Sequence, residues 1–412
     1  MIASIDIENF KSYSKTSVAL SPVTFLVGLN GSGKTNFLEL LKFIAWEARG
    51  GQLDALQQIA GPGHSEIRAL KVSDFVRRGE QQFSFALRLE NGEKYRLEQT
   101  VSVHEREGVV RMLITKEMLF NKDDKQVYRV DGAPQAAYHL LSSISNLPPQ
   151  FNRYNTQGSA KYVKDALSRI VFLEPNFSKM SRYVAISRGS TLESDGANLS
   201  AVAFRLCNDP ALKESFFDMV RTLPEREFKE IRFSKAELLD EVMLVCMEDN
   251  DNLVPLQLLS QGTLRMLLVG AALLTLPKGT LLVLEEIDTG IHPSRVAHLI
   301  KRVYEIAKER GIQVLATTHN PQVLNTLPEN EVANVVLCYR DNDCGCSRLT
   351  RFGDIPEYVE LLMRDDLGGL MVSEAVETVL RHPKTSEQRK DIGRDFLTRL
   401  KALPQHDSGS AK

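Results

Sequence analysis

Hydrophobic and polar positions alternate in some stretches of the chain and repeat with a helical period in others. The opening residues, MIASIDIENF, put Ala3, Ile5 and Ile7 on one face and polar side chains on the other, which predicts a β-strand. The apolar run VTFLV predicts a short buried strand, and the helical pattern FLELLKFIAWEARG follows it after a glycine-rich turn. Between about residues 70 and 130, alternating stretches with turn signals such as Asn91–Gly92 predict an antiparallel meander.

Helical patterns interrupted by short strands follow the meander. Residues 135–170 have the pattern of helices with loops, and the run RIVFLEP is a further strand candidate. Residues 196–222 repeat with a helical period, and two strands are expected near 229–234 and 242–248. Beyond residue 258 the order becomes helix, strand, helix, strand, in the stretches TLRMLLVGAALLTL, TLLVLEE, SRVAHLIKRVYEIAKERG and IQVLATTHN. Such alternation predicts an α/β fold with right-handed crossovers and a parallel sheet covered by helices.

Composition and charge narrow the class of protein. The 412 residues carry a net charge of -2, which argues against a protein that coats nucleic acid by bulk electrostatics. No apolar run reaches membrane-spanning length and the start shows no secretory signal, so we expect a cytoplasmic protein without a membrane partner. Five cysteines without a framework spacing predict a reducing cytosol. Asp, Asn and Gly around Cys344 and Cys346 indicate a hairpin turn rather than a metal site.

The stretch GLNGSGKT, Gly28 to Thr35, fits the phosphate-loop pattern and lies between an apolar strand and a helix, as that loop requires. Glycines let successive backbone N–H groups turn inward around a phosphate, and the helix N-terminus favours negative charge. Lys34 would reach the outer phosphates, and the Thr35 hydroxyl could bind Mg²⁺. The residues expected to contact ATP here are Asn30, Gly31, Gly33, Lys34, Thr35 and Asn36.

Two adjacent carboxylates, Glu285 and Glu286, end the predicted strand TLLVLEE. Ligands of parallel sheets bind at the carboxyl ends of the strands, where a nucleotide with Mg²⁺ would supply the positive partner that these charges need. Glu285 is expected to hold the metal, and Glu286, curled into the following turn, to polarise the water that attacks the γ-phosphate.

Two further stretches are ambiguous when taken alone. In LLSQGTLR, Ser260 can cap a helix that starts near Thr263 and Gly262 permits close backbone approach, so the stretch fits a phosphate site as well as a plain helix cap. In TTHNP, His319 follows an apolar strand. A lone histidine is more often structural, but beside a phosphate loop it becomes a candidate γ-phosphate contact.

These motifs, in this order, resemble the ATP-binding-cassette heads of SMC and RecF-type ATPases, and most closely the compact prokaryotic AAA-family ATPases related to OLD and RecF. LSQGT resembles the signature motif, VLEEIDTGIHP resembles Walker B with the D-loop, and TTHNPQVL resembles the switch histidine. The resemblance implies a first lobe with the phosphate loop and the antiparallel β subdomain in residues 1–175. It implies a second lobe in 176–355, followed by a helical segment and frayed tail in 356–412.

The resemblance also implies an ATPase whose heads dimerise, or assemble further, around shared ATP. The phosphate loop of one subunit would face Ser260 and Gly262 of another, and Glu286 and His319 would serve catalysis. Short chains of this kind resemble the sensor half of an anti-phage system with a separately encoded effector, a nuclease or toxin. Two residues depart from the motifs of these heads. Gln261 replaces a small or acidic residue of the signature motif, and Glu285 replaces the more common Asp of Walker B.

Three functions remain open from the sequence. The first is an ATPase switch that controls a partner effector. The second is a repair or recombination ATPase that clamps DNA directly, against which the near-zero net charge and few basic clusters weigh. The third is a nucleotide-dependent scaffold without hydrolysis, against which Lys34 and Glu286 argue.

Overall fold

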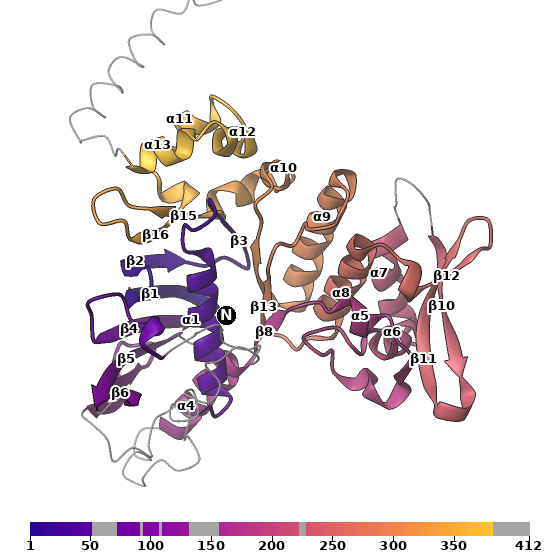
Figure 1. The fold of residues 1–412 in the computed structure, drawn as a ribbon, viewed down its shortest axis with the longest axis horizontal. Coiled ribbons are helices and arrows are strands. Elements are labelled where there is room, and N and C mark those ends of the chain that lie inside the picture. The colour runs from indigo at the N-terminus through magenta and orange to yellow at the C-terminus, as the bar shows by residue number, and fades with distance from the viewer. Residues whose placement is uncertain (52–71, 91–93, 107–108, 132–155, 222–227, 382–412) are drawn as a thin grey trace, which may run out of the picture.

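The computed structural model describes residues 1–51, 72–90, 94–106, 109–131, 156–221 and 228–381. The chain forms two lobes joined by a few strands (Figure 1). None of the helices in these ranges combines the length and apolar character needed to cross a bilayer.

One twelve-stranded sheet forms the first lobe and continues into the junction between the lobes. The strands from β7 to β2 pair antiparallel, and those from β15 to β8 pair parallel. Between these halves, β2 pairs parallel with β16, and β16 pairs antiparallel with β15. The strands, in spatial order, are β7 (Gln126–Asp131), β6 (Val109–Phe120), β5 (Lys94–Arg106), β4 (Gln82–Glu90), β1 (Ile2–Phe10), β2 (Tyr13–Ala19), β16 (Ser347–Arg351), β15 (Val336–Arg340), β3 (Val23–Val27), β14 (Gln313–Thr317), β13 (Leu281–Leu284) and β8 (Ile170–Leu173).

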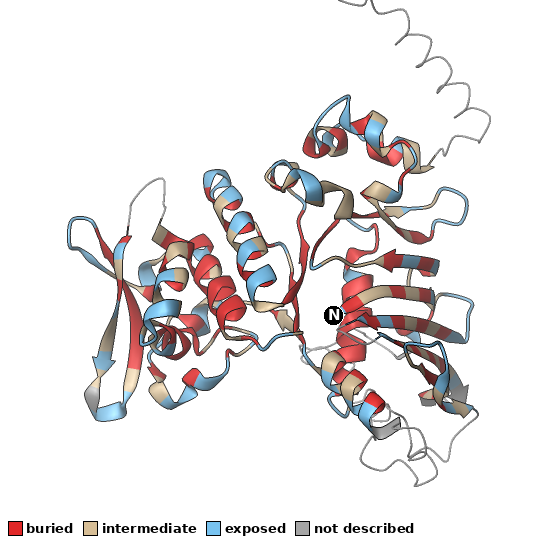
Figure 2. Cartoon of the chain, turned by 180° about the vertical axis from the view of Figure 1, so that it is seen from behind, coloured by how far each residue is buried: buried red, intermediate tan, exposed pale blue. Residues whose placement is uncertain are grey.

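Helices cover both faces of the parallel half and form the bulk of the second lobe. Figure 2 shows α1 buried along most of its length, like the strands that it covers. The helices are α1 (Lys34–Ala48), α4 (Thr156–Ser168), α5 (Phe177–Met180), α6 (Leu199–Cys207), α7 (Pro210–Arg221), α8 (Gln261–Thr275), α9 (Pro293–Arg310), α10 (Pro321–Leu324), α11 (Tyr358–Leu362), α12 (Leu367–Val372) and α13 (Ala375–Arg381). A smaller sheet of β9 (Val184–Ala185), β10 (Phe228–Ala236), β11 (Glu241–Glu248) and β12 (Leu253–Pro255) closes the far side of the second lobe.

Alternate residues of the parallel strands enter two different hydrophobic cores. In β3, Phe25 packs with α6 to α9, whereas Leu26 packs with α1 and α4. The same alternation occurs in β13, where Leu282 belongs to the first core and Val283 to the second. A strand buried on both faces reads as a continuous apolar run, which explains why VTFLV and TLLVL carry no polar alternation.

The predicted elements are largely confirmed. The first strand, the buried strand and helix around the glycine-rich turn, the meander, and the helix–strand alternation after residue 258 all occur. The cysteine pair lies in the turn of the β15–β16 hairpin, as predicted. The Asn91–Gly92 turn, most of the loops in 135–170 and the tail after residue 381 lie outside the described residues.

The large sheet draws strands from both of the segments expected from the sequence, 1–175 and 176–355. β13 to β16, which fall in the predicted second lobe, pair with strands of the first 175 residues and complete one sheet. This pairing is non-local, because β15 and β16 insert between β3 and β2, and no pattern along the chain specifies it.

The expectation of reduced cysteines is wrong for one pair, since a disulfide joins Cys344 and Cys346. Cys207, Cys246 and Cys338 are free thiols. Burial raises the pKa of Cys207 to about 11 and that of Cys246 to about 12, so both stay protonated at neutral pH.

A buried polar cluster joins α1 to the antiparallel strands. Glu47 of α1 and Glu117 of β6 are both 0% exposed. Gln99 of β5 donates from Nε2 to Glu47 Oε1 at 2.7 Å. Burial, and after it the nearby Glu117 carboxylate, raises the pKa of Glu47 well above its ordinary value of 4.5. Glu47 is therefore held in the protonated form, which an apolar site tolerates better than the charge.

Replacing this carboxyl should change how stability depends on pH. A carboxyl whose pKa is higher in the folded state stabilises the fold below pH 4.5 and loses that contribution as pH rises toward the folded-state pKa. Glu47→Gln keeps the shape and the acceptor oxygen, so its free energy of unfolding should fall less between pH 5 and pH 9. At high pH the free energy of unfolding of the variant should therefore exceed that of wild type. The difference should be about 1.4 kcal/mol for each unit by which folding raises the pKa of Glu47.

Urea unfolding followed by circular dichroism across that pH range measures the effect, and Glu80→Gln, at an exposed position, serves as the control. Parallel curves for wild type and Glu47→Gln would contradict the assignment of a protonated Glu47.

Candidate functional site

Three motifs meet at one edge of the sheet because the strands before them are parallel neighbours. β14 lies between β3 and β13, with Thr317 paired to Leu26 and Ala316 paired to Leu284. The phosphate loop follows β3, the two glutamates follow β13 and His319 comes just after β14. The side chains predicted for chemistry at Lys34, Glu286 and His319 are therefore brought together.

The phosphate loop turns sharply at its glycines. Gly31 and Gly33 have φ angles of 75° and 125°, in the region that favours glycine. A Cβ at Gly28 would lie 2.1 Å from the Cys338 carbonyl oxygen, and a Cβ at Gly33 would lie 2.3 Å from the Ser347 hydroxyl. Both glycines are thus required by the close approach of β15 and β16, whereas Gly31 at the tip faces open space.

Lys34 begins α1 and folds its ammonium back onto the loop. Its Nζ donates to the carbonyl oxygens of Gly28 at 2.7 Å and Leu29 at 3.0 Å. Burial lowers the pKa of Lys34, and the nearby thiol of Cys338 and carboxylate of Glu286 act in the opposite direction. No side chain caps this helix N-terminus at Gly33, so its first N–H groups remain available for an anion.

A hydrogen-bonded group of side chains holds the loop against the β15–β16 hairpin. The Ser347 hydroxyl donates to the carbonyl oxygen of Ser32 and is hydrogen-bonded with the Ser12 hydroxyl at 2.7 Å. Asn36 donates to the same Ser12 oxygen at 2.7 Å. Arg340 donates from Nε to the carbonyl oxygen of Gly31 at 2.9 Å. The loop is therefore positioned by contacts that come from residues about 310 positions later in the chain.

Glu286 occupies a strained turn directly after β13. Its φ of 49° is unusual for a residue with a side chain, and such strain often marks functional sites. Its N–H donates to Thr317 Oγ1 at 2.9 Å, and its Oε2 accepts from the Thr289 hydroxyl at 3.1 Å. Arg265 of α8 donates to the carbonyl oxygens of Glu285 and Glu286 at 3.2 and 3.1 Å. The predicted curl of Glu286 into the turn is confirmed.

Glu285 has a positive partner inside the protein, which the sequence did not reveal. Lys42 of α1 lies with its Nζ 3.6 Å from Glu285 Oε1 and also forms an ion pair with Glu174. Glu174 follows β8 as Glu285 follows β13, and Leu173 pairs with Leu284, so the two carboxylates end neighbouring strands. Lys42 is 7% exposed and also lies over the Phe172 ring at 5.0 Å. Its charge offsets the repulsion between the two carboxylates.

His319 is an exposed side chain whose charge state depends on its neighbours. Partial burial, and after it the Lys34 ammonium, lowers the pKa of His319 below its ordinary value of 6.5, while the carboxylates of Glu286 and Asp288 act in the opposite direction. His319 therefore lies within electrostatic range of both Lys34 and Glu286. At neutral pH the imidazole is uncharged and can donate one hydrogen bond.

The segment containing Ser260 and Gly262 lies at the start of α8, against the turn after β13. Ser260 caps α8, with its hydroxyl accepting from the Thr263 N–H at 3.1 Å. A Cβ at Gly262 would lie 2.1 Å from the Gly290 carbonyl oxygen, so glycine is needed where the turn after β13 crosses the helix start. Within the described residues, no hydrogen bond joins Ser260 to residues 28–35. The close approach expected of Gly262 occurs, but toward Gly290.

The residues at this edge fit a nucleotide with its metal. The uncapped helix N-terminus, the open tip at Gly31 and the Lys34 ammonium suit a phosphate chain. Asn30 and Thr35 are exposed on the same loop, and the Thr35 hydroxyl and Glu285 carboxylate are oxygen donors of the kind that Mg²⁺ prefers.

Sequence reasoning missed the residues that support this edge, Lys42, Glu174, Arg265, Arg340 and Ser347. Glu174 could have been found, because it ends the strand RIVFL in the same way as Glu285 ends TLLVL. The others are set by contacts between elements distant in sequence, which leave no local pattern.

Heads of SMC proteins are among the solved structures with a similar fold. One is titled "Crystal structure of the SmcHead bound to the C-winged helix domain of ScpA", with 14% identity, a TM-score of 0.50, and coverage of 85% of this chain and 97% of that chain. Another is the SMC head domain from Thermotoga maritima, with 16% identity, a TM-score of 0.44, and coverage of 85% and 98%. A third, the SMC head from Pyrococcus furiosus bound to the C-terminal domain of ScpA, has 12% identity, a TM-score of 0.49, and coverage of 88% and 99%.

The first of these likenesses establishes the fold, an ABC-type P-loop ATPase head with an antiparallel subdomain beside a parallel core. A search among curated proteins finds no match. Residues 23–325, most of the chain, match the family described as "AAA domain, putative AbiEii toxin, Type IV TA system". That stretch begins with β3 and ends after His319, so it contains all the motifs at the sheet edge. The chain is therefore a member of this AAA ATPase family, with a head of the ABC type.

Proposed function

We propose that this protein is a cytoplasmic ATPase whose heads engage on ATP and act as a switch that controls a separately encoded effector. The observation that carries the proposal is the convergence of Lys34, Glu286 and His319 at the carboxyl edge of β3, β13 and β14. Hydrolysis of a phosphoanhydride needs three such groups: a cation that binds phosphate, a carboxylate that activates water, and a neutral hydrogen-bond donor.

Binding begins at the phosphate loop. The N–H groups at the start of α1 point toward the loop, and the Lys34 ammonium exchanges the carbonyls of Gly28 and Leu29 for phosphate oxygens. Phosphate is the stronger partner, because hydrogen bonds between charged groups are about twice as strong as neutral ones. The N–H groups of Asn30, Gly31 and Gly33 and the side chain of Asn36 complete the proposed contacts.

Thr35 and Glu285 would hold Mg²⁺, which neutralises charge on the phosphates when bound. Glu285 reaches this position with one carboxylate oxygen already facing Lys42 at 3.6 Å. We infer that Lys42 and Glu174 orient Glu285, which is longer than the aspartate common in similar heads.

Glu286 is the proposed general base. Its backbone is fixed by Thr317 and Arg265, and its carboxylate accepts from the Thr289 hydroxyl at 3.1 Å, so its direction is set before substrate binds. A base held in this way abstracts a proton from a nearby water without a cost of reorganisation. The uncharged imidazole of His319 can donate to a γ-phosphate oxygen, where negative charge develops.

Engagement of two heads would complete the site. Ser260 is exposed at the start of α8, and in the described residues it forms no hydrogen bond with its own phosphate loop, which suits contact with ATP held by a second copy. Gly262 touches Gly290 in the turn after β13, and Arg265 holds the backbone of Glu285 and Glu286. A change at the proposed engagement surface can therefore reach the proposed base through α8.

The effector and the biological setting are supported by the family description, which names a toxin of a type IV TA system. A defence role against phage, with a nuclease or toxin as the partner, fits that description. Hydrolysis stimulated by DNA in the isolated protein would instead favour an ATPase that clamps DNA directly.

Substitutions at the two glutamates separate their roles. Glu286→Gln keeps the shape and loses the base, so ATP binding should persist while hydrolysis slows by about 100-fold to 10,000-fold. The variant should also accumulate ATP-bound dimers in sedimentation experiments. Glu285→Gln should instead shift the Mg²⁺ concentration needed for activity. The opposite pattern in phosphate-release assays, with Glu285→Gln as the trapped variant, would show that the roles are exchanged.

Contact between subunits is tested by Ser260→Arg. ATP affinity should stay close to that of wild type, because residues 28–35 make the proposed contacts to the phosphates. ATP-induced dimerisation and hydrolysis should be lost. Mixing Ser260→Arg with Lys34→Ala should restore part of the activity, since one composite site then pairs an intact loop with an intact Ser260. Normal dimerisation and turnover by Ser260→Arg alone would reduce Ser260 to a plain helix cap.

A further inference from the structure

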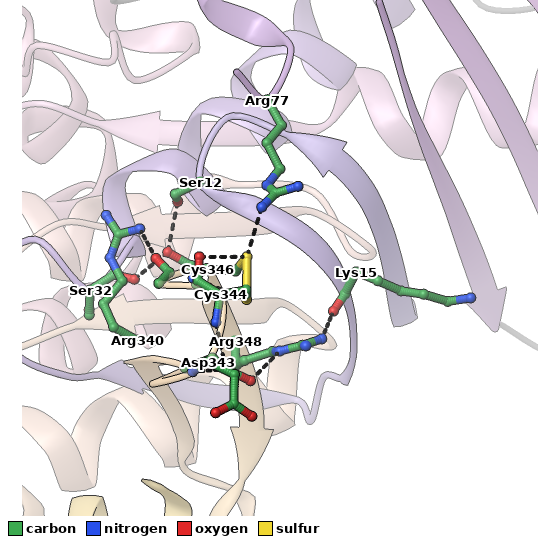
Figure 3. The surroundings of a disulfide bond; sticks show 12 residues. Ser12, Lys15, Ser32, Arg77, Arg340, Asp343, Cys344, Cys346 and Arg348 are labelled. Carbon is green, nitrogen blue, oxygen red and sulfur yellow. Dashed lines mark hydrogen bonds and ion pairs between the residues drawn. A yellow bond between two sulfur atoms is a disulfide. The ribbon is translucent and has the colours of Figure 1, made fainter. Parts of the chain in front are cut away.

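The turn of the β15–β16 hairpin carries a disulfide whose two sulfurs differ in their surroundings. Cys344 is exposed, whereas Cys346 is 2% exposed. Arg77, from the segment before β4, donates from Nη2 to Cys346 Sγ at 3.2 Å (Figure 3). An external thiol can therefore reach Cys344, and a guanidinium stands beside the sulfur of Cys346.

This asymmetry matches the chemistry of thiol–disulfide exchange. A thiolate that attacks one sulfur expels the other as a thiolate, and exchange is faster when the leaving thiolate is stabilised. A neighbouring guanidinium provides that stabilisation. Arg77 is itself held in place, because its N–H donates to the Asn9 carbonyl oxygen at 2.9 Å. Cys346 is therefore the better leaving group, and Cys344 is the sulfur that an external thiol can attack.

The same hairpin is joined to the phosphate loop. Arg340 donates from Nη1 to the Gly345 carbonyl oxygen at 2.8 Å, between the two cysteines, and from Nε to the Gly31 carbonyl oxygen at 2.9 Å. Ser347, directly after Cys346, donates to the Ser32 carbonyl oxygen. One guanidinium therefore spans from the ring closed by the disulfide to the tip of the phosphate loop.

We propose that Cys344 and Cys346 form a thiol–disulfide exchange site that couples the cellular thiol redox state to the order of the phosphate loop. The co-reactant is a dithiol reductant, small or protein-borne. The consequence for nucleotide binding rests on the proposed ATPase function, whereas the exchange and its effect on the loop do not.

The reaction balances with the dithiol alone. One thiolate of the reductant attacks Cys344 Sγ, the bond between the cysteines breaks, and Cys346 leaves as a thiolate beside Arg77. The second thiol of the reductant then attacks the mixed disulfide and frees the Cys344 thiolate. Two protons from the reductant end on the two cysteines, which are reduced, and the reductant becomes a cyclic disulfide.

Reduction should loosen the turn without opening it. Asp341 still accepts from the N–H groups of Asp343 at 2.9 Å and Cys344 at 3.3 Å, so the hairpin stays closed. Gly345, with a φ of 62°, is freed from the ring and no longer offers Arg340 a fixed acceptor. The loss of one ordered hydrogen bond should weaken ATP binding about threefold to tenfold.

The exchange itself is measured first, by counting free thiols in the intact protein with mass spectrometry during dithiothreitol treatment. Two additional free thiols should appear in wild type during the treatment. No additional thiol should appear in the Cys344→Ser and Cys346→Ser variants. Arg77→Met should slow their appearance, and Arg77→Lys should restore part of the rate. If no disulfide forms in air-oxidised protein, or if the rate does not depend on Arg77, the exchange site is refuted.

Coupling to the loop is measured by hydrogen exchange of the peptide covering residues 28–36, which needs no nucleotide. Exchange should be faster in the reduced protein, and Arg340→Met should remove the difference while leaving the thiol count unchanged. Cys207→Ser, a cysteine at the end of α6, is the matched control and should behave as wild type. Identical exchange in both redox states would refute the coupling.

Calorimetric titration of ATP in each state completes the experiment. A redox-dependent affinity that Arg340→Met abolishes is the expected result. Loop exchange that depends on redox state, together with no ATP binding in either state, would refute the proposed function and leave the coupling intact. Equal ATP affinity in both states despite different loop exchange would refute the link to nucleotide binding.

Discussion

The parallel pairing of β3, β14 and β13 is the constraint on which the rest of the site depends. These strands are buried on both faces, and a shift by one residue would move every side chain into the opposite core, so their register is strongly specified. With the register fixed, the segments that follow the strands must lie side by side. The phosphate loop, the glutamate turn and His319 meet for this reason.

Close backbone approach is the second condition. Gly28 and Gly33 face β15 and β16, and Gly262 faces Gly290, at distances that leave no room for a side chain. Arg265 and Arg340 then bridge from α8 and β15 to the backbone of the glutamate turn and of the phosphate loop. The site is therefore connected to the second lobe on one side and to the β15–β16 hairpin on the other.

Much of the fold and the motif residues could be predicted from the sequence, because strands with uniform apolar character, helical periods and glycine-rich turns are local signals. The insertion of β15 and β16 between β2 and β3 could not, since strand order is decided by pairing across more than 300 residues. Lys42 also escaped prediction, because its role depends on two strand ends that lie side by side only in the folded chain. The Cys344–Cys346 bond was missed because two cysteines separated by one residue also fit an ordinary hairpin turn.

The edge formed by β3, β13 and β14 is the proposed nucleotide site, with Lys34 as its main cation. Calorimetric titration of ATP with Mg²⁺ into wild type and Lys34→Ala tests this most directly, with circular dichroism to verify that the variant is folded. We expect measurable binding by wild type and no tight binding by the variant, because the ammonium that is removed would face the outer phosphates. Unchanged affinity in folded Lys34→Ala would contradict it.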